Sequence, residues 1–522
     1  MENKAPTTKT EDYASKVERL EQQVADLTNR LQWYEQQFRL SQQKRFGASS
    51  EQTHPDQLAL DMFNEAEALS DPTVSEPTVE SITYKRKKQV GGREAKLGAL
   101  PVERIEYRLS EEERSCPCCA EQLREMSTEV RRELAVIPEV VKAVEHVRYV
   151  YVCDRCEKEE ITTPIRTASM PTPMAPGSLA SPSIVAYIMS QKYADSLPLY
   201  RQEAHFLRMG IELSRQTMAN WLMSASESWL TPLYRYLHAD LLRRDILHAD
   251  ETSLQVLKEP GRAAQTKSYL WLYRTGRDEP AVVLYDYRQG RGSEHPERFL
   301  AGFSGYLQSD GYSGYRKLEG VTQLGCWAHA RRYYNDALQI VPLAQRSQTA
   351  AAEGLAFCNA LFEVERKWKS ATPEERYQAR LTESQPILGQ FHAWLQKQSA
   401  RALPKGLLGK AVTYSLNQWE KLTAFLKDGR LEIDNNRSER SIKPVVIGRK
   451  NFLFSNTPRG ARASAVIYSI VETAKANGLK PMAYLQHLFE QLPQLPDVSD
   501  PGALSELAPW SSSLPSACRQ KS

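Results

Sequence analysis

Two acidic residues stand at the ends of short apolar runs that are typical of β-strands. Asp250 lies on or just after the apolar part of ILHADETSLQV, while Asp310 ends GYLQSD and is followed at once by Gly311. The ends of strands are where a mixed sheet presents side chains to a common cleft, so two such acids can converge. Carboxylates are hard oxygen ligands suited to magnesium or manganese. Either acid alone would more often cap a loop, but together they favour a site for a divalent cation.

A third acid is found in the segment LEIDNNRSERSIKP. Asn435 or Asn436 can cap a helix whose first turns hold Glu439, with Pro444 near the end of that helix. Two nearby acids compete with Glu439 for the third place in the site, and the pattern leaves the choice open: Glu432 and Asp434.

Positive charge surrounds Glu439. Residues 437–462 contain seven bases and one acid. A carboxylate among bases makes sense for a polyanionic substrate, because metal ions need the acid and phosphates need the bases. A solvated surface is the usual alternative for any single charged run. The bases of this stretch that we expect to contact nucleic acid are Arg437, Arg440, Lys443, Arg449 and Lys450.

Two C-x-x-C pairs predict a zinc site. Cys116 and Cys119 form the first pair, and Cys153 and Cys156 form the second, with 33 residues between them. Each pair can bring two thiolates to one ion, and two pairs complete a tetrahedral shell. Cys118 allows a slipped ligand set, although C-x-x-C geometry favours Cys116 with Cys119. A closed shell of four thiolates leaves no position for a substrate, so we expect one structural Zn²⁺.

The composition is that of an ordinary globular protein. Of its 522 residues, 41% are hydrophobic and 25% are charged, so wholesale disorder is not expected. The N-terminus lacks a signal-peptide pattern, and no apolar run reaches the roughly 20 residues that span a bilayer. We therefore expect a cytoplasmic protein without a membrane partner, in which thiols stay reduced. Three cysteines without partner spacing are expected to be buried or free thiols: Cys326, Cys358 and Cys518.

The N-terminal segment carries a heptad pattern. Its apolar residues alternate in steps of four and three, which predicts a coiled coil over residues 1–48. A lone helix would expose that stripe to water, so self-association is favoured over packing against the same chain. An acidic and then basic linker follows over residues 49–98. The heptad positions are Tyr13, Val17, Leu20, Val24, Leu27, Leu31, Tyr34 and Phe38.

Residues 183–243 have a helical pattern that includes a candidate helix-turn-helix motif. Between residues 201 and 222, Gly210 supplies the break and Ser214 is a plausible N-cap for the second helix. A helical hairpin that packs on the next domain is an equally good interpretation. If the segment binds DNA, the side chains able to contact phosphates or base edges are Arg215, Gln216 and Asn220.

The following region is expected to be an α/β domain. Five short runs rich in β-branched and aromatic residues predict a mixed sheet over residues 244–335. Residues 336–428 are predominantly helical, as if inserted. The tail with many Pro and Ser residues is expected to be disordered. The expected divisions after the linker are a cysteine module at 99–165, the helical region at 183–243, an α/β core at 244–448, a small domain at 449–492 and the tail at 493–522.

Several motifs resemble those of one protein family, the insertion-sequence-66 (IS66) family of bacterial transposases. They are HADET around Asp250, QSDGY around Asp310, GCWAHARR from Gly325, and DNNRSERSIKP around Glu439. The likeness continues through RKNFLFSNTPRGARASAVIYSIVETAKANGL, and backward through the QKYADSLPLYRQE helices, the cysteine module and the coiled coil. It covers nearly the whole chain in the family's order.

The resemblance implies a multidomain α+β protein with a ribonuclease-H-like catalytic core. In such a core Asp250, Asp310 and Glu439 hold two Mg²⁺ or Mn²⁺ ions for phosphoryl transfer, and Asp250 bridges them. The implied reaction is cleavage at transposon ends and strand transfer into target double-stranded DNA. His329 and Arg332 could touch the scissile phosphate, although a packed histidine and a surface arginine are equally plausible. Accessory proteins encoded by the element are implied as possible partners.

Two other classes of function remain open from sequence. A DNA-binding regulator with a zinc ribbon and a helix-turn-helix would explain the first half of the chain, but not three acids in a basic environment. A nuclease of the same fold that does not transpose would share the acids, but it would not need segments for end binding or oligomerisation.

Overall fold

The described part of the chain contains all the candidate acids. A computed structural model describes residues 169–277 and 280–520, together with residues 141, 142, 144, 146, 150, 151, 166 and 167. The predicted coiled coil, the linker and the four cysteine ligands lie outside the described residues. Two short strands, β1 (Val150–Tyr151) and β2 (Arg166–Thr167), pair antiparallel.

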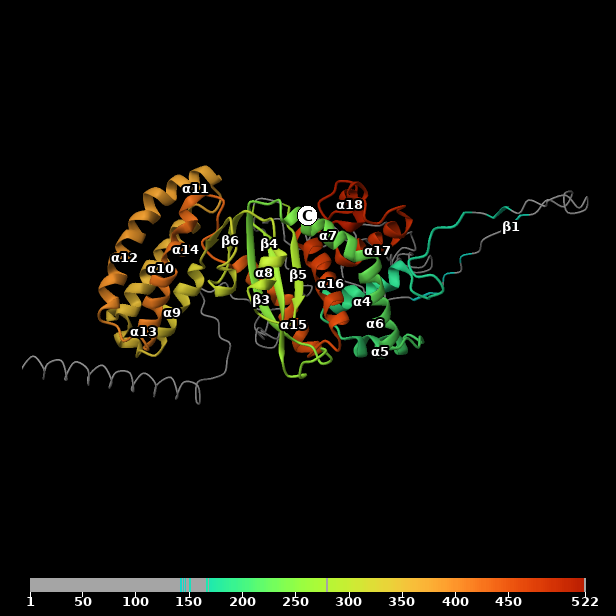
Figure 1. Ribbon diagram of the computed structural model, residues 1–522, viewed down its shortest axis with the longest axis horizontal. Helices are drawn as coiled ribbons and strands as arrows, with labels where there is room; N and C mark the ends of the chain where they lie inside the picture. The colour runs from blue at the N-terminus through green and yellow to red at the C-terminus, as the bar shows by residue number, and fades with distance from the viewer. Residues whose placement is uncertain are drawn as a thin grey trace, which may run out of the picture. The chain divides into compact units, whose positions relative to one another are not determined.

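A five-stranded mixed sheet forms the centre of the molecule (Figure 1). The strands are β3 (Ile246–Gln255), β4 (Lys267–Thr275), β5 (Val283–Arg288), β6 (Gly305–Gln308) and β7 (Val321–Leu324). Their order is β5-β4-β3-β6-β7; the β3–β4 and β4–β5 pairs are antiparallel, and the β3–β6 and β6–β7 pairs are parallel. Each strand falls in one of the five predicted runs, so the predicted mixed sheet is confirmed.

The helices before the sheet contain the expected helix-turn-helix geometry. They are α4 (Pro182–Tyr193), α5 (Leu199–Arg208), α6 (Arg215–Ala225) and α7 (Thr231–Leu241). Gly210 adopts φ of 82°, a conformation that favours glycine, and so it can end α5. The Ser214 hydroxyl accepts a hydrogen bond from the Thr217 amide at 3.1 Å and thereby caps α6.

These helices share one hydrophobic core with the sheet and with the C-terminal helices. The C-terminal elements are α15 (Asn436–Phe452), α16 (Pro458–Ala476), α17 (Pro481–Gln491) and α18 (Pro501–Leu507). The shared core includes Leu237 of α7, Leu272 of β4 and Ile470 of α16. The structure therefore joins segments that the sequence suggested as separate domains, because none of them buries its apolar face alone.

Helix α16 covers the outer edge of the sheet. Its Ser469 hydroxyl accepts a hydrogen bond from the Tyr285 amide at 2.8 Å, and its Thr473 hydroxyl accepts one from the Val283 amide at 3.0 Å. Both amides belong to β5, the last strand on that side. The side chains of α16 therefore satisfy main-chain groups that an edge strand would otherwise expose.

The prediction of a disordered tail from about residue 493 is wrong. Pro501 begins α18 instead of breaking structure, because proline is well tolerated in the first turn of a helix. The Asp500 carboxylate caps this helix by accepting from the Ala503 amide at 3.0 Å. The tail stays in place by burying apolar side chains, namely Leu504, Leu507, Leu514 and Cys518.

The helix of Glu439 is also longer than expected. Pro444 was predicted near its end, yet α15 continues to Phe452. A proline inside a helix removes one hydrogen bond. Burial of Ile442 and Val445 in the shared core offsets that loss, so tertiary packing overrides the local signal.

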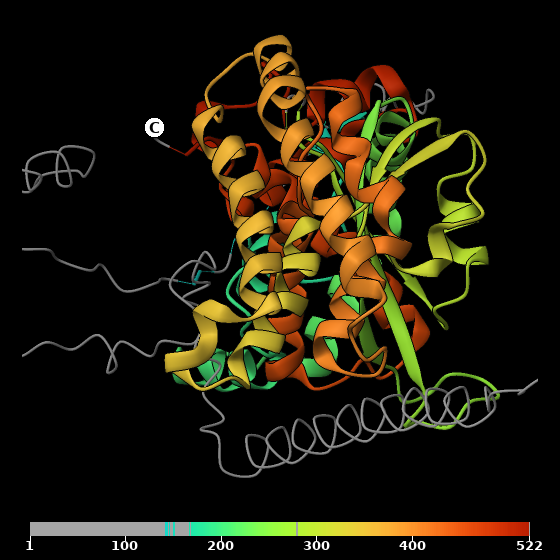
Figure 2. The same cartoon turned by 90° about the vertical axis from the view of Figure 1, so that its left-hand side faces the viewer.

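The predicted helical block lies between β7 and α15 and builds a second core. Figures 1 and 2 show it beside the sheet. The core centres on Trp327 and Phe391 and reaches the sheet through Ile246 and Leu324. The helices are α9 (Trp327–Gln339), α10 (Ala350–Lys367), α11 (Pro373–Ala379), α12 (Gln385–Ser399), α13 (Leu407–Asn417) and α14 (Trp419–Thr423).

A buried arginine ties the block to the segment that leads to α15. Arg380 forms a bidentate pair with Glu365, with both N–O distances 2.7 Å. The same guanidinium donates to the carbonyl oxygens of Phe425 at 2.8 Å, Asp428 at 2.9 Å and Leu431 at 2.8 Å. Every one of these acceptors would lose a charged donor if the arginine were removed.

We predict that Arg380→Ala lowers the free energy of unfolding by about 3–5 kcal/mol, because it leaves a buried carboxylate and three carbonyls unpaired. Urea unfolding followed by tryptophan fluorescence measures the loss. Arg366→Ala is the matched control, since Arg366 pairs with Glu363 at the surface at 2.7 Å and should change stability by less than about 1 kcal/mol. Equal losses in the two variants would contradict this role for Arg380.

Candidate carboxylate site

The topology of the sheet places Asp250 and Asp310 on neighbouring parallel strands. His248 of β3 pairs in register with Gln308, the last residue of β6. Asp250 and Asp310 each lie two residues beyond that pair, Asp250 within β3 and Asp310 just after β6 ends. Two strands that run in the same direction thus carry both acids to the same level of the sheet.

Hydrogen bonds in and around the turn after Asp310 hold the side chain and the carbonyl oxygen of that residue in place. Its carboxylate accepts a hydrogen bond from the Tyr312 amide at 2.9 Å, and its carbonyl oxygen accepts one from the Tyr414 hydroxyl at 3.2 Å. Gly311 has φ of 91°, and a Cβ there would lie 3.2 Å from the Gln418 side chain. A glycine is therefore required directly after the acid.

Glu439 approaches the two aspartates from the first turn of α15. Burial raises the pKa of Asp250 well above its usual range, and the negative charges of Glu251, Asp310 and Glu439 raise that pKa further. Asp310 and Glu439 therefore both lie within electrostatic reach of Asp250. Carboxylates crowded in this way repel each other, and a bound cation would offset the repulsion.

Asn435 is the residue that holds α15 against the strand of Asp250. Its side-chain amide donates to the Ala249 carbonyl at 3.0 Å, and its Oδ1 lies 3.2 Å from Nδ1 of His248. Its backbone amide donates to the Cys326 Sγ at 3.2 Å, and its carbonyl accepts from the Glu439 amide at 3.2 Å. Asn435 stands at the N-cap position but makes no side-chain cap, so it connects three segments instead of capping the helix as predicted.

The two competing acids have other partners. Glu432 forms a bidentate pair with Arg437, with both N–O distances 2.9 Å, and lies 3.3 Å from Arg277. Although burial opposes ionisation, these cations lower its pKa to about 2. Asp434 accepts from the Asn436 amide at 3.0 Å. Glu432 is therefore committed to an ion-pair network, and Glu439 is the acid of this segment that adjoins Asp250.

Two residues of α9 flank Glu439. His329 Nδ1 lies 3.8 Å from Glu439 Oε1, and an Arg332 guanidinium nitrogen lies 4.0 Å from Oε2. The first turn of α9 therefore faces the first turn of α15. Both side chains border the acid site, and their contact with a scissile phosphate stays a prediction.

Glu251 is a fourth carboxylate that the sequence did not single out. Successive residues of a strand point to opposite faces of a sheet, and Glu251 faces away from α15. It accepts from Arg291 Nε and from the Tyr315 hydroxyl, each at 2.8 Å. With both oxygens engaged, Glu251 anchors the site from the other face. No spacing rule distinguishes it from an ordinary strand residue.

The predicted nucleic-acid contacts fall into two groups. Arg437 pairs with Glu432, and Arg449 donates to the hydroxyls of Thr252 at 3.2 Å and Ser253 at 3.1 Å on β3. Those two side chains help to hold α15 in place. Lys443 is half-buried, and the others lie exposed on α6 or α15: Arg215, Gln216, Asn220, Arg440 and Lys450.

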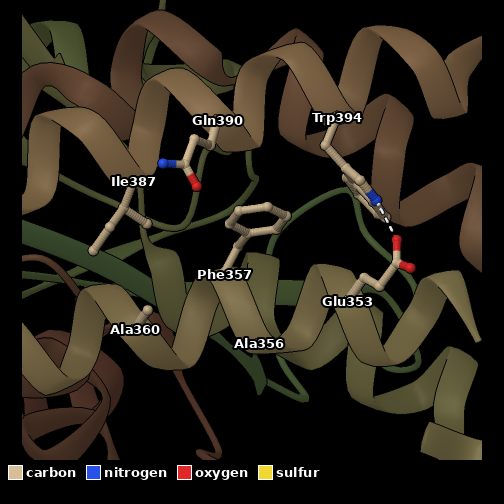
Figure 3. A pocket seen from close by; sticks show the side chains of 7 residues that line it. All are labelled: Glu353, Ala356, Phe357, Ala360, Ile387, Gln390 and Trp394. Carbon is tan, nitrogen blue, oxygen red and sulfur yellow. Dashed lines mark hydrogen bonds between the residues drawn. The ribbon is translucent and has the colours of Figure 1, made fainter. Parts of the chain in front are cut away.

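A hollow of about 400 Å³ lies elsewhere, between α10 and α12 (Figure 3). Phe357 and Trp394 face into it from the two helices, and Trp394 Nε1 donates to Glu353 at 2.7 Å. None of the predicted site residues lines it, and its surface is mostly apolar. It therefore carries none of the chemistry of the carboxylate site.

Comparison with known proteins identifies the family. A family model described as "Transposase IS66 family" matches residues 177–463, which include Asp250, Asp310 and Glu439. The chain belongs to this family. The resemblance drawn from the HADET, QSDGY and DNNRSER motifs is thereby confirmed.

Three further models of the same family match other parts of the chain. The "IS66 C-terminal element" matches residues 469–510, and the "zinc-finger binding domain of transposase IS66" matches residues 113–157. The latter range contains all four predicted cysteine ligands and supports a zinc site in this IS66 protein. The model "Transposase C of IS166 homeodomain" matches residues 33–105.

Similar chains occur in Sinorhizobium fredii (strain NBRC 101917 / NGR234). The uncharacterized protein y4qI is 35% identical over 66% of this chain and 65% of its own length. The uncharacterized proteins y4jD and y4hP are each 31% identical, over 79% and 76% of this chain and 81% and 73% of their own lengths. Their names assign no activity, so the family identity rests on the IS66 models. No helix within the described ranges is long and apolar enough to cross a membrane.

We predict that Asn435→Ala lowers the free energy of unfolding by about 1–3 kcal/mol, because it strips buried polar groups of β3 of their partner. Chemical denaturation measures the effect. The neighbouring Asn436→Ala is the control, since that side chain bonds Asp434 locally at 2.8 Å and its loss should cost less than about 1 kcal/mol. A larger loss for Asn436→Ala would contradict the connecting role of Asn435.

Proposed function

We propose that the chain cleaves DNA at transposon ends and joins those ends to target DNA, with Asp250, Asp310 and Glu439 as the catalytic metal ligands. The observation that carries the proposal is that the parallel strands β3 and β6 bring Asp250 and Asp310 to one level of the sheet, while Asn435 bonds the start of α15, which bears Glu439, to β3. The acids come from β3, from the turn after β6 and from α15, within the range that matches the IS66 transposases. The mixed sheet with α15 against it supports a ribonuclease-H-like core.

The donor set fits hard divalent cations. Three carboxylates offer oxygen ligands, as Mg²⁺ and Mn²⁺ prefer. When bound, two such ions supply activation of the attacking hydroxyl and stabilisation of the leaving oxygen. Burial and the like charges of neighbouring acids raise the pKa of Asp250, and a bound cation would offset that repulsion, which supports the proposal.

The surrounding residues of the chain would position the acids and the DNA. Asn435 orients the turn that bears Glu439, and Glu251 is held by Arg291 and Tyr315 on the opposite face of β3. Arg332, with 46% of its side chain exposed beside Glu439, is available to a phosphate group. Arg440 is exposed one residue after Glu439 and extends the basic surface.

Helix α6 is proposed as a second DNA contact. Arg215, Gln216 and Asn220 are exposed on it, and the Ser214 cap rigidifies its first turn. A helix that presents such side chains at its N-terminal end suits the major groove or the phosphates beside it. A merely structural hairpin would leave DNA affinity unchanged on substitution of these three residues.

The segments outside the described residues complete the proposal. We propose that Cys116, Cys119, Cys153 and Cys156 bind one structural Zn²⁺, and that the heptad segment at 1–48 makes the protein a homo-oligomer that can hold two DNA ends. Accessory proteins of the element remain proposed partners. The basis is the zinc-finger match and the a/d spacing of apolar residues.

We predict that Asp250→Asn, Asp310→Asn and Glu439→Gln each reduce end cleavage and strand transfer by more than about 100-fold. Loss of a direct ligand should exceed the 10–100-fold effect typical of an outer-shell partner. The assay uses purified chain, Mg²⁺ and a labelled transposon end. Glu363→Gln is the control, because this carboxylate is exposed and forms its ion pair with the surface residue Arg366.

Full cleavage and joining by all three variants would show that the catalytic assignment is wrong. Cleavage that depends on the acids but never yields joined products would favour the nuclease of the same fold. Specific binding of DNA ends without any cleavage would favour the regulator.

We predict that Cys153→Ser lowers the zinc content of protein purified without added zinc from about one ion per chain towards zero. Elemental analysis measures it. Cys358→Ser is the control, because Cys358 is a buried free thiol in α10 and should leave the zinc content unchanged. Unchanged zinc in Cys153→Ser protein would exclude this ligand set.

A further inference from the structure

Glu439 shares a compact cluster with two residues whose chemistry differs from that of the aspartates. Ligand atoms of Cys326, His329 and Glu439 all lie within 4.8 Å of one another. Within this group His329 Nδ1 is 3.8 Å from Glu439 Oε1. A thiol and an imidazole have no place in a purely magnesium-binding set, because Mg²⁺ prefers oxygen ligands.

Two buried atoms of the cluster lack hydrogen-bond partners. His329 Nδ1 and Glu439 Oε1 are both shielded from solvent, and neither makes a hydrogen bond within the described part of the chain. Their separation is too long for a direct hydrogen bond. Buried polar atoms are normally satisfied, so these two facing atoms indicate a position for a shared partner.

The local structure preorganises the three groups. Cys326 is the N-cap residue of α9, and His329 follows three positions later, so both lie on one side of the first helical turn. The Trp327 amide donates to the Ile433 carbonyl at 3.1 Å, and the Asn435 amide donates to the Cys326 Sγ at 3.2 Å. These bonds hold the first turn of α9 against the segment that carries Glu439.

We propose that Cys326, His329 and Glu439 form a binding site for a zinc-class ion, distinct from the cysteine module. Thiolate, imidazole and carboxylate are the three ligand types of zinc, and three protein ligands leave a fourth tetrahedral position open. Ligand atoms around such an ion are separated by about 3.3–3.7 Å. The nitrogen and oxygen, 3.8 Å apart, need only a small closure, and the three ligand atoms, which lie within 4.8 Å of one another, need to close by up to about 1 Å. Binding releases the thiol proton to solvent and requires no oxidant.

The zinc-class site would affect catalysis because it uses Glu439, which is also a proposed ligand of the catalytic ions. This consequence rests on the proposed function, in which Glu439 serves the catalytic ions. An ion held by Cys326 and His329 would draw Glu439 away from those ions, so a zinc-class metal would inhibit the reaction in competition with Mg²⁺. The soft thiolate makes the site selective for Zn²⁺ over Mg²⁺, so Zn²⁺ should occupy it at a far lower concentration than Mg²⁺.

The test uses Co²⁺ as a spectroscopic probe on the full chain whose cysteine module already holds zinc. We expect a thiolate-to-cobalt charge-transfer absorption that saturates at one added ion per chain. Cys326→Ser should abolish this absorption, and Glu439→Gln should weaken Co²⁺ binding by about 10-fold or more. Cys358→Ser is the matched control, because it removes a buried thiol of the neighbouring helix and should leave the spectrum unchanged.

A second arm measures end cleavage in Mg²⁺ with increasing Zn²⁺, normalised to each variant's own activity without zinc. We expect Cys326→Ser to raise the half-inhibitory zinc concentration by about 10-fold or more. A charge-transfer band that persists in Cys326→Ser protein, or its absence from the unmodified chain, overturns the site. A band that behaves as expected in a chain that cleaves no DNA leaves the site standing and overturns the proposed function, so the two failures are distinguishable.

Discussion

The arrangement of the acid site depends on the burial of one amide side chain. Asn435 is fully buried and connects a β-strand, the first turn of α9 and the first turn of α15. Its partners on β3 are His248 and Ala249, the two residues that precede Asp250. Because an unpaired amide in this environment would be costly, the hydrogen bonds of Asn435 help to set the position of Glu439 relative to Asp250, beside the apolar packing of α15.

A long segment of chain separates β7 from α15, the helix that carries Glu439, and this segment is folded into helices. The helices between β7 and α15 build their own core, so they need not deform the sheet. Arg380, in the middle of this block, donates to carbonyl oxygens at the end of the block and in the segment that returns towards Asn435. The block also contacts the site directly, through His329 beside Glu439 and through Tyr414, which bonds Asp310.

The sequence predicted the elements with strong local patterns. The five strands, the break at Gly210 and the cap at Ser214 each follow from residue type and spacing, and the structure contains them all. Asp310 lies just after the end of β6, as its position at a strand end predicted, but the same prediction for Asp250 is wrong, because β3 continues past it to Gln255. Pattern reasoning alone left Glu439 as one of three acids, and the family resemblance singled it out.

What the sequence missed depends on partners that are remote along the chain. Glu251 resembles any polar strand residue until Arg291 and Tyr315 approach it from other elements. Pro444 is expected near the end of its helix, yet it lies inside α15, which continues to Phe452. Composition suggested a loose tail, yet burial of Leu504 and Leu507 holds it to the core. The structure of these segments depends on burial against parts of the chain that are distant in sequence, and a short stretch of sequence does not reveal that burial.

The cover that α16 places over β5 has a consequence for assembly. Hydroxyl groups of Ser469 and Thr473 occupy main-chain positions that a neighbouring strand would need for pairing. A second copy of the chain therefore cannot join this sheet by adding a strand at that border. At this border two copies of the chain could therefore meet only through helical surfaces or through segments beyond the sheet.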